Sequence, residues 1–450
     1  MWKNKFHISP PFGLLNDPNG LIFWNNEYHI FYQWNPNACE HGSKHWAHLK
    51  SKDLVNWESL PTALSPNDWF DKNGCYSGSA IEKDNKLYLF YTGNVKNNNI
   101  RESYQCLAVS TNGIDFEKKG PVIHDKDIPK EYTKHFRDPK VFIKDGVYKM
   151  VLGAQRLDLT GTIVVFSSYN LIDWCFEQEI INGNFGFMCE CPDFIEDNNN
   201  KALILSPQGI KANGDLFNNR YQSGYIIRDL YDVEKNDFIE LDRGFEFYAP
   251  QTFKDENNKN VLIGWIGMPE ELDHPSIEKE NWVHSLTIPR VLEIKKNKIL
   301  QKPHNNLKKL RKEKIVIENI CLENTIDLSK YNILGDTYEL IISLEDFSKH
   351  IEIDLRKNGD ERTTFSFDPI EKKASLNRNF SGSGYKGIRK CYLKDLKKIH
   401  IFVDKCSIEI FLNNGEEVFT GNIYPNKDSL GIEINSKMLF TIPKIEFYKF

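Results

Sequence analysis

The segment Leu15-Asn16-Asp17-Pro18-Asn19-Gly20, followed by apolar stretches at residues 21–24 and 28–33, opens the first of five similar units within the first 290 residues. The later units begin near residues 76, 136, 189 and 247, and each again places a polar turn between two apolar stretches. Repeats of about 50 to 60 residues with about four short strands are typical of a β-propeller, whose blades surround a central channel. We therefore expect an all-β protein that begins with a five-bladed β-propeller.

An acidic residue stands at the same point in three of the five units, where the first strand of the unit is expected to begin. These are Asp17, Asp138 in Phe136-Arg137-Asp138-Pro139-Lys140 and Glu190 in Cys189-Glu190-Cys191-Pro192-Asp193, whereas the other units carry Tyr76-Ser77-Gly78-Ser79 and Phe247-Tyr248-Ala249-Pro250. Asp-Pro and Asn-Gly are ordinary turn formers, so one such motif alone would carry no functional meaning. Three carboxylates in one register of a closed ring would meet at one mouth of the channel, where their repulsion calls for a compensating purpose.

Paired carboxylates at a sugar-sized site can cleave a glycosidic bond, one attacking the anomeric carbon while the other protonates the leaving oxygen. We expect the charge of Asp17, together with partial burial, to raise the pKa of Glu190. Asn16 and backbone donors of its turn are expected to hold Asp17 ionised. Arg137 adds a fixed positive charge beside Asp138, and its fork is suited to hold a neighbouring carboxylate oxygen.

Length and composition indicate two domains and exclude several classes of partner. A chain of 450 residues exceeds the usual size of one core, and we expect the propeller to occupy residues 1–300 and a second domain residues 301–450. The formal net charge of -5 argues against nucleic acid and anionic membranes as partners, and no apolar run approaches the length of a membrane span. The N-terminus lacks the apolar segment of a signal peptide, and the nine scattered cysteines are expected to be mostly reduced, so we expect a cytoplasmic protein.

The second half of the chain changes to plain alternating segments, which predict a C-terminal β-sandwich. Its expected strands cover residues 337–344, 350–355, 363–367, 398–403, 407–412, 417–420 and 438–447. We expect the fifth blade to close through residues 282–293, and the polar residues 295–298 and 302–306 to form a solvated linker before a short helix at 307–312. The sandwich shows no cluster of catalytic groups, and it is the expected surface for any homo-oligomer.

The three acidic motifs, in this order and at these separations, resemble the signature motifs of glycoside hydrolase family 32, the invertases and related β-fructofuranosidases. The resemblance covers nearly the whole chain and implies a five-bladed propeller followed by a β-sandwich. It implies a retaining reaction on a small-molecule fructoside, with Asp17 as nucleophile, Glu190 as acid/base and Asp138 as transition-state stabiliser. Residues matching positions that line the fructose site in that family are Gln33, Ser77, Arg137 and Trp265; we add Asn16, Tyr76 and His41 as substrate-binding candidates.

Segments 41–46, 264–270 and 282–290 resemble the bacterial sucrose-6-phosphate hydrolases within that family. A phosphate on the substrate needs cationic or donor groups at the rim, and the candidates are His41, Lys44, His45, Lys134, His135 and His284. The sequence departs from the family pattern at Ala47, where Gly is usual, and at Glu246, where Asp is usual and where we expect altered contacts around the rim. Trp34, Trp46 and Trp265 are candidates either for stacking on a sugar or for packing inside the blades.

We expect neither a metal nor an organic cofactor, since His41, His45 and His48 lie in a segment expected to be loop and strand, where the i, i+4 spacing of a helical metal site does not apply. Two other functions remain open. An inverting arabinan or xyloside hydrolase would also use a propeller with three carboxylates, but its carboxyl pair would be about 6.5 to 9.5 Å apart rather than about 5 to 5.5 Å. A non-catalytic carbohydrate-binding propeller would not need both Asp17 and Glu190.

Overall fold

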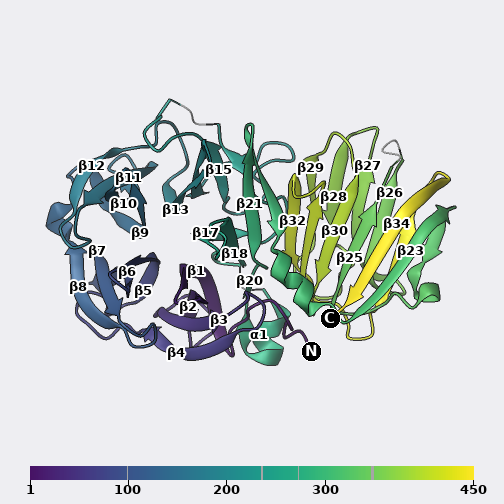
Figure 1. Ribbon diagram of the computed structural model, residues 1–450, viewed down its shortest axis with the longest axis horizontal. Coiled ribbons are helices and arrows are strands. Elements are labelled where there is room, and N and C mark those ends of the chain that lie inside the picture. Colours follow the sequence, from purple (N-terminus) through teal and green to yellow (C-terminus); the bar gives the residue numbers. More distant parts are fainter. Residues whose placement is uncertain (99, 235–236, 272, 346–348) are drawn as a thin grey trace.

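The computed structural model describes all 450 residues except residues 99, 235–236, 272 and 346–348. Five sheets form a ring on one side of the molecule, and two further sheets lie beside it (Figure 1). The first strands of consecutive blades contact one another, β1 with β5, β5 with β9, β9 with β13 and β13 with β17. Because β17 also contacts β1, the ring is closed, and the expected five-bladed propeller is confirmed.

Each blade is a mostly antiparallel sheet whose first strand lies on the channel side (Figure 1). The strands of the first three blades are β1 (Gly13–Trp24), β2 (Glu27–Asn35), β3 (His45–Ser51), β4 (Glu58–Leu64); β5 (Cys75–Lys83), β6 (Lys86–Asn97), β7 (Ile100–Ser110), β8 (Glu117–Ile123); and β9 (Tyr132–Lys144), β10 (Val147–Arg156), β11 (Gly161–Ser168), β12 (Cys175–Glu179). The other two blades contain β13 (Met188–Asp197), β14 (Asn200–Gln208), β15 (Gly224–Ile227), β16 (Ile239–Glu240); and β17 (Tyr248–Lys254), β18 (Asn260–Ile266), β20 (Ser285–Leu286), β21 (Arg290–Lys295), β22 (Lys298–Pro303).

The acidic motifs lie inside the first strands rather than at their beginnings, which corrects the expectation from sequence. β1 begins four residues before Asp17, and β9 begins six residues before Asp138. At the motif the pairing register shifts in each of the five blades, between Leu15 and Pro18 in the first and between Glu190 and Asp193 in the fourth. A β-bulge bends a strand and redirects a side chain, so Pro and Asn inside these strands mark a repeated bulge rather than a strand end.

The segment that follows the fifth blade's second strand closes the ring. β19 (Trp282–Val283) pairs in parallel with β1. Residues 282–283 therefore belong to the first blade, which corrects the expectation that they belong to the fifth. The expected linker at residues 295–298 is also wrong, because β21 and β22 form a hairpin there. Three lysines and an asparagine at residues 295–298 give this hairpin the composition of a linker. The expected domain boundary near residue 300 falls within β22.

The C-terminal half contains two six-stranded sheets that enclose one apolar core, which confirms the β-sandwich. One sheet has the order β23 (Glu313–Leu322), β34 (Phe440–Lys449), β25 (Tyr338–Ser343), β30 (Lys398–Val403), β31 (Ser407–Leu412), β32 (Glu417–Asn422). The other has β24 (Thr325–Asp327), β33 (Gly431–Asn435), β26 (Ile351–Asn358), β27 (Glu361–Asp368), β28 (Lys373–Asn377), β29 (Ile388–Tyr392). The short helices are α1 (Pro275–Glu280), η1 (Asp125–Asp127), η2 (Asn305–Leu310) and η3 (Leu328–Tyr331). None of the described helices is long and apolar enough to cross a membrane.

Buried charges join the propeller to the sandwich. Arg290 of β21 is fully buried and bonds to Asp242 and to Glu409 of the sandwich. Glu246, also fully buried, accepts hydrogen bonds from Arg378 and from the backbone N–H of Asn422, both in the sandwich. Glu246 therefore belongs to the interface between the domains, and the expectation that it shapes the rim of the site is wrong.

Candidate active site

The bulges of blades one, three and four bring the three sequence-predicted carboxylates to one place. The thiol sulfur of Cys191, the residue after Glu190, lies 3.6 Å from Oδ2 of Asp17 and 3.7 Å from Oδ2 of Asp138. The backbone N–H of Cys191 donates to the same Asp138 oxygen at 3.0 Å. Positive φ angles of 66° at Asp138 and 45° at Cys191 accompany these bulges. The register seen in the sequence thus becomes a cluster in space.

Asp17 is held by side chains of neighbouring strands rather than by its own turn. The Ser77 hydroxyl donates to Asp17 Oδ2, and Gln33 Nε2 approaches the same oxygen at 3.5 Å. Asn16, expected to bond Asp17, instead accepts a hydrogen bond from the Lys44 ammonium group. Burial raises the pKa of Asp17 to about 6, against the opposing effect of the Ser77 bond, and the charge of Glu190 adds to the rise.

Glu190 is the most fully bonded of the three carboxylates. Arg137 donates to its Oε1 from Nε at 3.0 Å and from Nη2 at 2.7 Å. Its Oε2 accepts from Gln208 Nε2 at 2.8 Å and from the Tyr248 hydroxyl at 2.7 Å. The expected guanidinium therefore holds a carboxylate from a different blade, while its distance to Asp138 is 4.0 Å. The Glu190 side chain keeps 18% of its surface exposed, which leaves it accessible from the channel.

Asp138 is the most buried member of the cluster, and its pKa is raised further than that of Asp17. Burial first and the charge of Glu190 second raise its pKa to about 7, while Arg137 opposes the rise. Asp138 and Asp17 therefore both have raised pKa values. Carboxylates crowded at one site cannot all ionise freely, so this cluster combines ionised and protonated groups near neutral pH.

The remaining predicted substrate residues lie at two depths around the cluster, some buried beside Asp17 and others nearer the opening. Ser77 and Gln33 are buried beside Asp17, whereas Tyr76 lies nearer the opening, where its hydroxyl is 3.3 Å from His41 Nε2. Trp265 is only 2% exposed and packs against Tyr248 and His284, with its indole N–H unpartnered among the described residues. Trp46 is fully buried in the blade core, while half-buried Trp34 donates to the carbonyl of Phe12.

The six candidates for recognising a phosphate separate by burial. Lys44 and His284 are buried, and burial lowers the pKa of Lys44 to about 7, so neither is a rim group. Lys134 pairs with Asp125 instead, and a ring nitrogen of His45 is buried without a partner among the described atoms. His41 and His135 remain near the cluster, the latter 3.2 Å from Arg137.

Several residues that contact the cluster were not singled out from the sequence. Tyr248 and Gln208 hold Glu190, and the Arg101 guanidinium lies over the Tyr76 ring at 5.9 Å. Tyr248 had a detectable signal, since it stands in the fifth unit at the position equivalent to the acidic residues. Arg101 had none, because it follows a hairpin turn with no repeated motif.

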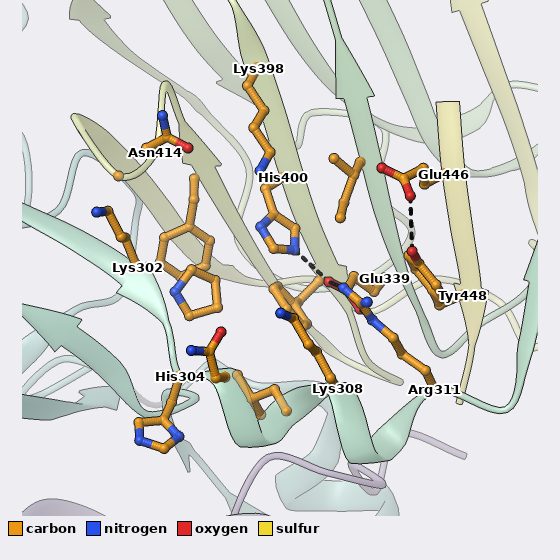
Figure 2. Close-up of a pocket in the computed structure, with 17 residues that line it drawn as sticks. Lys302, His304, Lys308, Arg311, Glu339, Lys398, His400, Asn414, Glu446 and Tyr448 are labelled. Atoms are coloured by element: carbon orange, nitrogen blue, oxygen red, sulfur yellow. Dashed lines mark hydrogen bonds and ion pairs between the residues drawn. The ribbon is translucent and has the colours of Figure 1, made fainter. Parts of the chain in front are cut away.

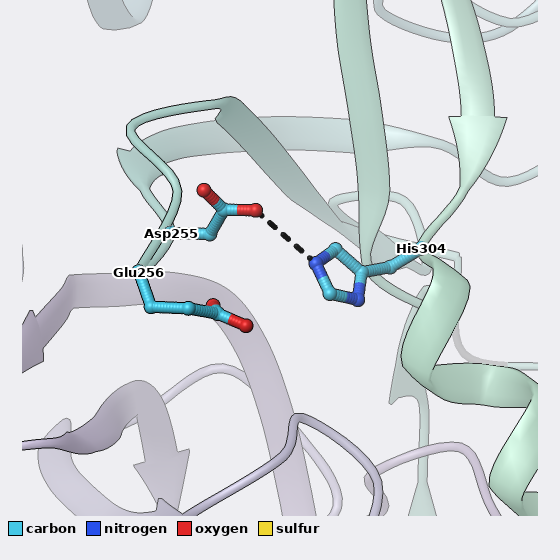
Figure 3. Close-up of side chains that lie close together, drawn as sticks. All are labelled: Asp255, Glu256 and His304. Atoms are coloured by element: carbon cyan, nitrogen blue, oxygen red, sulfur yellow. Dashed lines mark hydrogen bonds and ion pairs between the residues drawn. The ribbon is translucent and has the colours of Figure 1, made fainter.

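Within the described part of the chain, the one group of His, Cys, Asp and Glu side chains that could hold a metal ion lies elsewhere. Asp255, Glu256 and His304 place their ligand atoms within 4.8 Å of one another, at the junction of blade five and η2 (Figure 3). His304 Nδ1 already accepts the backbone N–H of Asn306, and its Nε2 lies 3.4 Å from Asp255. These contacts account for His304 as the cap of η2.

Comparisons with known proteins agree over the whole chain. The model of the Glycosyl hydrolases family 32 N-terminal domain matches residues 7–303, and that of the family 32 C terminal matches residues 306–449. A sucrose-6-phosphate hydrolase of Bacillus subtilis is 43% identical over 438 residues, covering 94% of this chain and 89% of the relative. One of Staphylococcus xylosus is 38% identical, covering 99% and 92%.

Solved structures give the same result. A sucrose-6-phosphate hydrolase from Lactobacillus gasseri superimposes with a TM-score of 0.88 at 30% identity, covering 100% of this chain and 93% of the other. A Bombyx mori GH32 beta-fructofuranosidase gives a TM-score of 0.86 at 32% identity, covering 100% and 94%. With matches to both family domains and relatives of this similarity, the chain is a glycoside hydrolase and belongs to glycosyl hydrolases family 32.

Proposed function

We propose that this protein is a retaining β-fructofuranosidase in which Asp17 is the nucleophile, Glu190 the acid/base and Asp138 the transition-state stabiliser. The observation that carries the assignment is the gathering of three carboxylates from three blades around Cys191. Each role matches a different environment. Asp17 is held by neutral donors, Glu190 by an arginine fork, a tyrosine and an amide, and Asp138 is buried.

In the first step, an oxygen of ionised Asp17 attacks the anomeric carbon of the fructosyl unit while Glu190 gives its proton to the departing oxygen. Glu190 then takes a proton from water, which attacks the fructosyl-enzyme ester and releases Asp17. Arg137, Tyr248 and Gln208 hold the Glu190 carboxylate in one orientation through both steps. Asp138 is suited to accept hydrogen bonds from sugar hydroxyls, which tighten as the oxocarbenium-like transition state forms.

For the substrate, we favour sucrose 6-phosphate over sucrose. His41, His135 and Arg101 lie close to Tyr76 and Arg137, beside the catalytic carboxylates. Charge-assisted hydrogen bonds are worth about 1.5 to 3 kcal/mol each, so one cation on the phosphate corresponds to roughly tenfold to a hundredfold in kcat/KM. Both bacterial relatives are named for this phosphorylated sugar, which supports the choice.

The test is hydrolysis of sucrose and sucrose 6-phosphate side by side, with the anomer of the released fructose followed by NMR. We expect β-fructofuranose as the first product and a higher kcat/KM for the phosphorylated sugar. Glu190→Ala should lose turnover of sucrose but recover it on an aryl fructoside whose leaving group needs no proton. Initial release of the α-anomer would reject the retaining assignment in favour of an inverting glycosidase, and no turnover of any fructoside would favour a binding propeller.

A cytoplasmic location is part of this proposal, and a phosphorylated substrate and nine unpaired cysteines support it. The formation of a homo-oligomer through the sandwich stays a prediction. Measuring the molecular mass of the protein in solution tests it.

A further inference from the structure

A second pocket of about 340 Å³ lies away from the channel, on the outer face of the sandwich sheet that contains β25, β30, β31 and β34. η2 and the end of β22 form its opposite wall (Figure 2). Because side chains alternate along a strand, Leu340 and Ile342 of β25 face the sandwich core while Glu339 and Ile341 face this pocket. The volume falls in the range typical of sites for small molecules.

The negative charges in the pocket wall already have cationic partners. Arg311 places a fork on Glu339, with Nε to Oε2 at 2.6 Å and Nη2 to Oε1 at 2.7 Å, and His400 Nε2 bonds the same carboxylate at 2.6 Å. Glu446 lies 3.2 Å from the Lys444 amine and accepts from the Tyr448 hydroxyl. The carboxylates therefore add no uncompensated negative charge to the pocket.

Two positive charges have no such compensation. Figure 2 shows Lys308 and Lys398 reaching into the pocket from opposite sides, with His400 between them. Among the described residues neither amine has a recorded hydrogen bond or ion pair, whereas Lys302 in the same wall pairs with Glu293 at 2.8 Å. Fixed positive charges that face one cavity attract a compact anion. The pocket therefore presents an excess of two positive charges.

The floor between the lysines is apolar. Phe402 and Phe411 are each 1% exposed, and Ile341 and Leu307 complete the surface. A bare inorganic anion would leave this floor and most of the volume to water, while a neutral sugar would leave both ammonium groups unmatched. A ligand with a dianionic head and a ring-sized body satisfies the charge, the floor and the volume together.

We propose that this pocket binds a small phosphomonoester of the size of a sugar phosphate, with the phosphate between Lys308 and Lys398. Ligand bound there would touch η2 and the sandwich sheet at once, and so would stabilise the junction of the two domains. The site is separate from the carboxylate cluster and does not depend on the function proposed for it.

The probe is glucose 6-phosphate, with inorganic phosphate and glucose as the other two arms, titrated calorimetrically into the full chain at low salt. We compare Lys308→Met/Lys398→Met with Lys390→Met/Lys394→Met, a matched pair of exposed lysines on and just after β29 in the other sheet. The control pair should keep the wild-type isotherm. The pocket pair should lose one binding site per chain, or bind there at least about tenfold more weakly.

Sucrose hydrolysis at the wild-type rate in both double variants verifies that they are folded. Unchanged hydrolysis also shows that the channel is intact in both double variants. Any binding of glucose 6-phosphate in the channel is then common to all variants, and a difference between their isotherms reports on the second pocket. Identical isotherms for the two double variants would refute the site. Glucose binding as tightly as its phosphate would refute the role of the lysines, and equal affinity for inorganic phosphate would refute the sugar-sized body.

Discussion

Replacing Asp17 by Asn should abolish turnover and make the folded protein more stable above pH 6. The folded state raises the pKa of Asp17 from 3.8 to about 6, a difference that corresponds to about 3 kcal/mol. The folded protein binds this proton more tightly than the unfolded chain does. The carboxyl group therefore lowers the free energy of unfolding progressively as the pH rises from about 4 to about 6.

An amide at this position cannot ionise, so the variant lacks this loss. Ser77 would donate to a neutral oxygen instead of a carboxylate, at a cost of about 1 kcal/mol. A net gain of about 2 kcal/mol in the free energy of unfolding should remain at pH 7.5, and the gain should vanish near pH 4. Urea unfolding at both pH values measures it, and kcat for sucrose should fall by more than about thousandfold.

Asp193→Asn provides the matched control, because it removes a carboxylate from a bulge motif without changing either member of the proposed catalytic pair. Asp193 is fully buried, pairs with Lys140 at 2.9 Å and accepts the Thr252 N–H at 2.7 Å. Loss of its carboxylate leaves the largely buried Lys140 ammonium group without a negative partner, which should cost about 3 to 5 kcal/mol. If Asp17→Asn destabilises the protein as Asp193→Asn does, the carboxyl group of Asp17 is not held under electrostatic strain and our account of the site is wrong.

Four further outcomes are expected. The pH profile of kcat/KM for sucrose should fall on the acid side with a midpoint near pH 6, as Asp17 becomes protonated; a midpoint near pH 4 would contradict its raised pKa. Arg101→Met should reduce the preference for sucrose 6-phosphate over sucrose by about tenfold while kcat for sucrose is unchanged, measured as the ratio of the two kcat/KM values. Arg290→Met should lower the free energy of unfolding by about 3 to 5 kcal/mol, seen as a shift of the urea midpoint, because it leaves Asp242 buried without its cation and Glu409 with His7 alone. Exhaustive chelation should leave turnover unchanged, and activity that disappears and returns with one added metal would overturn the expectation of a metal-free reaction.

The sequence was sufficient for the propeller, for the sandwich and for the gathering of Asp17, Asp138 and Glu190. A repeated motif predicts which residues meet in space, because equivalent positions of a closed ring of blades face the same axis. It was not sufficient for the strand ends, because Pro and Asn inside β1 indicate a turn, whereas the bulge keeps the chain within the sheet. Five sandwich strands were missed, β23, β24, β28, β29 and β33. Most are short or lie at or beside a sheet edge, where charged residues obscure the alternation.

Partner choice within the site could not be predicted, because it depends on contacts between blades. Arg137 is adjacent to Asp138 in sequence, yet its fork holds Glu190, 53 positions away. Glu246 looked like a rim residue because it precedes the fifth repeat, but its partners come from the sandwich. The sequence determines the position of a residue along its strand. The partner of a long flexible side chain such as Arg or Glu depends instead on which groups lie within its reach across the channel or the domain interface.

The same contacts support the two-step chemistry proposed for the cluster. Burial and mutual repulsion raise the pKa of Asp17 and of Asp138 against the opposing charges of Lys44 and Arg137, so full ionisation of the three carboxylates is costly in this poorly solvated site. The least costly arrangement keeps one proton among the carboxylates, and a group that can give and take a proton is what an acid/base residue requires. Arrival of the fructosyl unit removes water from the cluster and strengthens these interactions. In the proposed reaction, the shared proton is thereby available to the departing oxygen, and Asp17 is left ionised for attack.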